Sequence, residues 1–127
     1  MGCRSGNTGN FVVSFWDFES SARLAQTTVN VTDNTKYFYN TITPIEIVPN
    51  KRYIISLNNN NGGVPADYWI CYKKEANPDG IDYNIYPFNI ESVTFESPYG
   101  KTSSTVVFPN NPQSPWNFFA GADVQFE

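Results

Sequence analysis

The chain has 127 residues, a formal net charge of −4, 17% aromatic residues and 16% charged residues. This length fits one domain with a substantial core, predicted over residues 1–127. The acidic balance and the lack of a Lys/Arg cluster exclude the basic footprint of a nucleic-acid-binding protein, and no apolar run is long enough to span a membrane.

The first residues, MGCRSG, resemble two processing signals without completing either one. A myristoylation signal needs Ser or Thr where the chain has Gly6, and a lipoprotein cysteine needs a preceding apolar segment. We therefore expect a domain that is truncated at its N-terminus. Cys3 and Cys71 either pair or remain as free thiols, and two buried free thiols are the favoured interpretation.

Strand patterns follow one another along the chain, and no helical period of useful length occurs. The predicted strands cover residues 11–17, 24–31, 36–41, 45–48, 52–58, 67–74, 90–96, 105–108 and 122–127. Turn segments rich in Asn, Asp, Gly and Pro separate them. Many short strands with frequent turns are typical of an all-β fold, either a β-sandwich or a barrel, with antiparallel sheets.

The first predicted strand is apolar on both faces. Phe11, Val13 and Phe15 alternate on one face, and Trp16 lies on the other. A strand that packs on one face only does not need a Trp on its second face. Trp16 is therefore either a core residue or part of a binding surface, and the packing role is favoured.

The absence of histidine limits the chemistry that this chain can perform. It excludes Ser-His-Asp and Cys-His arrangements and the usual zinc sites. Carboxylates for glycoside hydrolysis are present but lie in no motif, and we interpret them as solvated surface charges. A Ca²⁺ site at residues 77–84 would have suitable oxygen ligands, but a plain turn is favoured there because EF-hand spacing is missing. We predict no enzyme, no metal site and no cofactor. The carboxylates considered are Asp17, Glu19, Asp67, Glu75, Asp79, Asp82, Glu91, Glu96 and Asp123.

Several short motifs, in this order, give the chain a family resemblance. They are Thr8-Gly9, Phe15-Trp16-Asp17, Leu24-Ala25, Pro44, Pro49, Tyr53, Phe118-Phe119 and Asp123-Val124-Gln125-Phe126. With these motifs the chain resembles a family of uncharacterised bacterial β-sandwich modules. The resemblance implies an antiparallel, jelly-roll-like β-sandwich in a secreted or cell-surface protein, often beside domains that act on polysaccharides or serve adhesion. Such modules usually carry one or two further strands before the Thr8-Gly9 turn, so we expect an open N-terminal edge through which two copies can associate.

The loop at residues 109–117 contains the best candidate for ligand contact. It holds Trp116 beside prolines and amides, and an accessible ring with nearby amides suits the apolar face and the hydroxyls of a sugar. We therefore predict a non-catalytic extracellular or surface module that binds carbohydrate. The alternative is a structural or adhesin-like domain that contacts a surface protein and has no glycan site. The predicted ligand-binding residues are Trp116, Asn117, Tyr99, Asn58, Asn59 and Asn60.

Overall fold

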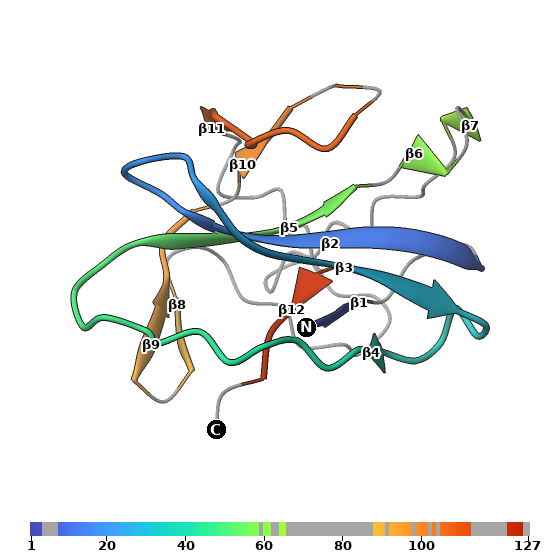
Figure 1. The fold of residues 1–127 in the computed structure, drawn as a ribbon, viewed down its shortest axis with the longest axis horizontal. Helices are drawn as coiled ribbons and strands as arrows, with labels where there is room; N and C mark the ends of the chain where they lie inside the picture. The colour runs from blue at the N-terminus through green and yellow to red at the C-terminus, as the bar shows by residue number, and fades with distance from the viewer. Residues whose placement is uncertain are drawn as a thin grey trace, which may run out of the picture.

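The structure is a computed structural model, and it describes residues 1–3, 8–58, 60–61, 64–65, 88–90, 92–97, 99–101, 103, 105–112 and 122–125. In this part of the chain the elements are all strands and every ladder is antiparallel, which confirms the all-β prediction (Figure 1). No helix capable of crossing a membrane occurs among the same residues. The predicted strand 67–74, with Trp69 and Cys71, lies outside them.

Within the described residues, twelve strands form five small sheets. The central sheet has the order β3-β2-β5, and a second three-stranded sheet has the order β12-β1-β4. The remaining strands form the pairs β6-β7, β8-β9 and β10-β11. The strands are β1 (Gly2–Cys3), β2 (Gly9–Asp17), β3 (Arg23–Val31), β4 (Phe38–Tyr39), β5 (Tyr53–Asn58), β6 (Asn60–Asn61), β7 (Val64–Pro65), β8 (Phe88–Ile90), β9 (Val93–Phe95), β10 (Tyr99–Gly100), β11 (Asn111–Pro112) and β12 (Ala122–Asp123).

The central sheet is built on β2, which pairs with β3 on one side and β5 on the other. A turn at residues 18–22 joins β2 to β3, and it contains Ser21 in the left-handed region with a φ of 58°. The register of β2 against β3 shifts between Phe15 and Trp16. Because Phe15 faces Ala25 and Trp16 faces Arg23, Leu24 is the extra residue of a β-bulge in β3, which bends and twists that strand where it leaves the turn.

The central sheet and the sheet β12-β1-β4 both contribute side chains to the hydrophobic core. Phe11, Val13 and Phe15 of β2 project into it, as the predicted alternation requires. Met1 and Cys3 enter from the second sheet and are also buried. The apolar residues at positions 53, 55 and 57 pack on this core from β5.

The second face of β2 is buried too. Trp16 is 5% exposed and Ser14 is fully buried. The indole Nε1–H of Trp16 donates to Ser56 Oγ at 2.8 Å, and its ring meets the edge of Phe108 with centroids 5.8 Å apart. The interpretation of Trp16 as a packing residue is therefore confirmed.

Several predicted boundaries are wrong for local reasons. Residues 90–96 were expected as one strand, but Ile90 pairs with Val93 and the chain turns between them. Residues 45–48 form no ladder in the structure, and they lie between Pro44 and Pro49, which cannot donate backbone hydrogen bonds. Residues 105–108 also form no ladder.

The N-terminal strand β1 is paired on both sides, with β12 and with β4. The amino group of Met1 donates to the Asn40 carbonyl at 3.0 Å, and the Asn40 N–H donates back to Met1. An open N-terminal edge, expected from the sequence, is thus not found at Gly2–Cys3. Cys3 is a free, fully buried thiol, and burial raises its pKa to about 11, which keeps it protonated and unreactive.

Candidate functional site

The residues predicted to bind ligand are spread over the molecule. Tyr99 lies in β10 and pairs with Pro112 of β11, which leads toward the loop that carries Trp116. Asn58 is the last residue of β5 and pairs with Val12, and Asn60 starts β6. Trp116, Asn117 and Asn59 lie outside the described residues.

Tyr99 and Asn58 are too far apart to contact one sugar ring. Tyr99 packs beside Phe18 and Arg52, at the start of β5, whereas Asn58 ends that strand. Six residues of extended chain between positions 52 and 58 span about 20 Å. The predicted set therefore divides into two groups at opposite ends of β5.

The group at the start of β5 is a cation–aromatic cluster, defined here as Phe18, Arg52, Glu96 and Tyr99. The guanidinium carbon of Arg52 lies 3.7 Å from the centroid of the Phe18 ring, and Nε donates to Glu96 Oε2 at 2.8 Å. Burial would lower the pKa of Arg52, but hydrogen bonds to Glu96 and Tyr99 outweigh it and raise the pKa. The cation is thus already neutralised by this chain's own carboxylate.

The same cluster continues inward to the buried Trp16. The Phe18 ring meets Tyr99 edge-on at 5.4 Å and Phe108 at 6.3 Å, and Phe108 meets Trp16. Edge-to-face packing of this kind uses the ring surfaces that a ligand would need. Tyr99 thus packs at the outer end of an aromatic cluster that reaches Trp16 through Phe18 and Phe108.

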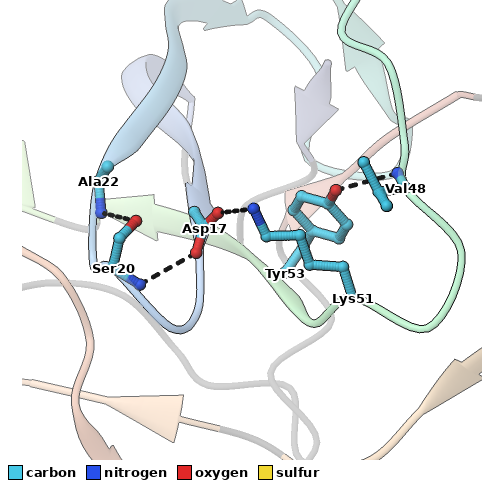
Figure 2. Close-up of polar contacts among 6 residues, drawn as sticks. All are labelled: Asp17, Ser20, Ala22, Val48, Lys51 and Tyr53. Carbon is cyan, nitrogen blue, oxygen red and sulfur yellow. Dashed lines mark hydrogen bonds and ion pairs between the residues drawn. The ribbon is translucent and has the colours of Figure 1, made fainter.

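A carboxylate and an ammonium group tie the two turns next to this cluster together (Figure 2). Asp17 ends β2, and its carboxylate accepts a hydrogen bond from the Ser20 N–H at 3.0 Å and forms an ion pair with Lys51. On the neighbouring turn, the Val48 N–H donates to the Tyr53 hydroxyl at 3.1 Å. The contacts hold the turn after β2 against the turn before β5.

Asp17 is the most buried of the described carboxylates, with a side chain 8% exposed, so its expected role as a solvated surface charge is wrong. The hydrogen bond from Lys51, followed by that from Ser20, lowers the pKa of Asp17 to about 2. A carboxylate with so low a pKa is a weak base, which suits a structural tie and not proton transfer at neutral pH.

Two exposed tyrosines on β4 and just before it form a different kind of surface, called here the tyrosine pair. Tyr37 is 40% exposed and Tyr39 is 39% exposed, and their rings stack with centroids 6.2 Å apart and planes 26° from parallel. Between them Phe38 turns inward and packs on the core. The alternation of the strand thus places both tyrosines on the outer face.

Tyr39 is held in place from two directions. Its hydroxyl donates to Asp123 Oδ2 on β12, and its ring lies against Gly2 of β1, where a Cβ would meet it. Burial, followed by the hydrogen bond to Asp123, raises the pKa of Tyr39 to about 12, so the phenol stays protonated as a donor. The pair is therefore exposed and also rigid at its Tyr39 end.

The alternation of residues 36–40 is the sequence feature that indicates this surface. The segment KYFYN at residues 36–40 lies in a predicted strand, and its alternation puts Tyr37 and Tyr39 opposite the apolar Phe38. What the sequence lacked was the partner, because Asp123 and Gly2 are far from Tyr39 along the chain.

No protein-family model, curated protein or solved structure matches this chain. Among the described residues, no group of three or more His, Cys, Asp or Glu side chains is arranged to hold a metal ion. Among the described residues, the tyrosine pair is a surface on which two stacked rings remain exposed.

Proposed function

We propose that this chain is a non-catalytic module of a secreted or cell-surface protein and that it binds carbohydrate. The observation that carries the proposal is the tyrosine pair, whose two rings are about two-fifths exposed and nearly parallel. A sugar presents apolar C–H faces that stack on such rings and hydroxyls that need polar partners. The Asp123 carboxylate, which is anchored to Tyr39, supplies an acceptor beside the rings.

The non-catalytic part of the proposal is supported by the chemistry of the side chains. The chain has no histidine. Asp17 is the most buried carboxylate among the described residues, and the hydrogen bond from Lys51 lowers its pKa and keeps it ionised. Incubation with soluble polysaccharides should release no reducing ends, and release that disappears when one carboxylate is mutated would contradict this.

The proposed scaffold is a jelly-roll-like sandwich, as the family resemblance implies. This part of the proposal is supported by the hydrophobic core, to which the central sheet and the sheet β12-β1-β4 both contribute side chains. In such sandwiches, ligand-binding side chains sit on an outer face or in the loops at one end.

The test is a glycan array or affinity electrophoresis with soluble polysaccharides, using the whole chain. Tyr37→Ala should abolish the signal because it removes one ring, whereas the matched control Tyr37→Phe keeps the ring and should keep binding. If binding survives Tyr37→Ala and is lost in Trp116→Ala, the site lies instead in the loop predicted from the sequence. Absence of binding to every glycan would overturn the proposal.

A structural or adhesin-like role in binding a surface protein is the second candidate. It is favoured by Ile47 and Val48, which are exposed at 40% and 49% on the segment before β5. Exposed apolar side chains suit a protein contact better than a sugar. Protein binding that is lost in Val48→Asp but kept in Tyr37→Ala would support this second candidate.

A further inference from the structure

The outer edge of β3 is the most open strand edge in the described structure. β3 pairs with β2 on one side, and on its other side no ladder is formed by the residues that the structure describes. Leu24, Gln26, Thr28 and Asn30 are all exposed, whereas every residue of β5, at the opposite edge of the sheet, is at least partly covered. A strand of nine residues that has no ladder partner on one side, among the described residues, is long for an edge strand.

One contact shows which backbone groups of β3 point outward. The side-chain amide of Asn40 donates to the Thr28 carbonyl at 2.6 Å from the side away from β2. In an antiparallel ladder, the N–H and C=O of one residue point toward the same neighbour, and the direction alternates along the strand. The backbone groups of Gln26 and Asn30 therefore point outward with those of Thr28, ready to pair with another strand.

The neighbouring segment leaves space along this edge. Residues 41–45 run back beside β3 without pairing with it (Figure 1). A cavity of about 430 Å³ lies between this segment and residues 24–27. Ile42 and Ile45 pack on the core from this segment. A strand added about 4.8 Å from β3 would lie over the cavity.

Most of this edge lacks the features that normally prevent pairing with a second copy. Natural edges are blocked by charges, prolines or bulges. β3 has one charged residue, Arg23, and one bulge, at Leu24, and both lie at its start; from Ala25 to Val31 its register is regular and it contains no proline. If two β3 strands pair antiparallel about a two-fold axis at Thr27, residues 25–29 overlap in regular register and Gln26 faces Thr28 of the second copy. The two Arg23 side chains then lie about 26 Å apart along the strands, so like charges do not meet.

We propose that two copies of this chain associate through the outer edges of β3, forming a continuous six-stranded antiparallel sheet with its two-fold axis at Thr27. This isologous contact uses the same edge twice and closes on itself. It is independent of the glycan proposal, because the tyrosine pair is not part of β3. In the dimer, a ladder hydrogen bond from the second copy replaces the hydrogen bond that the Asn40 side chain donates to the Thr28 carbonyl.

Sedimentation velocity of the whole chain over a concentration series is the first measurement, and it should show monomer passing to dimer. Gln26→Pro removes an outward N–H without removing a bond to β2, and it should raise the dimer Kd at least about tenfold, because two symmetry-related hydrogen bonds are lost. The matched control Gln26→Ala keeps the N–H and should dimerise like the original chain. Asn40→Ala frees the Thr28 carbonyl and should lower the Kd.

Charge variants test the register. In Gln26→Lys/Thr28→Lys, each introduced charge faces a like charge of the second copy, so dimerisation should be lost. In Gln26→Lys/Thr28→Glu, each faces an opposite charge, so dimerisation should return. Equal dimerisation of the two double variants would overturn the proposed contact.

Hydrogen exchange on the unmodified chain keeps the test independent of whether any variant folds. The backbone N–H groups of Gln26, Thr28 and Asn30 should exchange more slowly at high concentration, while exposed amides elsewhere keep their rates. A chain that remains monomeric at its highest soluble concentration, with concentration-independent exchange at these three positions, would overturn the proposal.

Discussion

Two aromatic regions of this molecule have opposite environments. The rings of Trp16, Phe18 and Phe108 pack against one another on the second face of the central sheet. The rings of Tyr37 and Tyr39 stack on the outer surface of β4. Both regions use near-neighbour aromatic contacts, so the presence of such contacts alone does not distinguish packing from binding.

The difference comes from the strand beneath each region. β2 is central in its sheet, and both of its faces are buried in its second half, where Ser14 and Trp16 are as buried as Phe15 and Asp17. β4 is a two-residue strand at the edge of its sheet, so only Phe38 reaches the core. A ring is available to a ligand when it lies on a solvated face of its strand. Whether a strand has a solvated face depends on the packing of its sheet and not on the residue type.

Replacement of Trp16 should give the largest effect. Trp16→Ala removes a buried ring and its hydrogen bond to Ser56, and we expect the free energy of unfolding to fall by about 3–5 kcal/mol. Tyr37→Ala, the matched aromatic deletion on the exposed surface, should cost less than about 1 kcal/mol. Urea denaturation of both variants measures the contrast, and equal losses would show that the two regions do not differ as described.

Gly2→Ala should have the next largest effect, because it links the exposed tyrosine to the core. An added Cβ would meet the Tyr39 ring and the Phe38 carbonyl oxygen, so β1 or the ring has to move. Overpacking of this kind costs about 1–3 kcal/mol. The thermal midpoint measures it, and a variant that keeps the midpoint and the glycan affinity would show that Tyr39 is not held by Gly2.

Ser56 and Ser14 provide a smaller and more selective comparison within the buried region. Ser56→Ala removes the acceptor of the Trp16 indole and leaves a buried N–H unpaired, which should cost about 1–2 kcal/mol. Ser14 is fully buried, and its hydroxyl has no partner among the described contacts. Ser14→Ala should therefore be neutral or slightly stabilising in urea denaturation, and a loss matching that of Ser56→Ala would reveal a missed partner of Ser14.

The sequence predicted the long strands well because their side chains alternate over many residues. The strands predicted at 11–17, 24–31 and 52–58 each agree with the structure to within two residues at either end. The alternation lies within each strand, so it can be read from the sequence even though β5 pairs with β2 from far along the chain.

The short strands and the candidate site depended on contacts that no local pattern contains. Gly2–Cys3 forms a strand only because residues near positions 39 and 122 flank it. In the same way, Asp17 looked like a surface charge until Lys51, from another turn, was placed beside it. Predictions at Trp116, Asn117 and Asn59 remain predictions, because these residues lie outside the described part of the chain.

The tie between Asp17 and Lys51 should have the smallest effect at neutral pH and a distinct signature in acid. The folded pKa of Asp17 is about 2, below the ordinary value of about 3.9 for an unfolded Asp, because Lys51 and then Ser20 donate to the carboxylate. Its contribution to stability is therefore present above about pH 4 and is lost as the pH falls through about 2. Stability should decline across this window in the original chain.

Urea denaturation at several pH values between 2 and 6 tests this final prediction. Asp17→Asn cannot ionise, so its stability should change less between pH 4 and pH 2 than that of the original chain. Lys51→Met removes the largest cause of the lowered pKa but keeps the hydrogen bond from Ser20, so its pH dependence should fall between the two. An Asp17→Asn variant with the original slope would show that other carboxylates carry the acid sensitivity and that this turn is tied by its backbone alone.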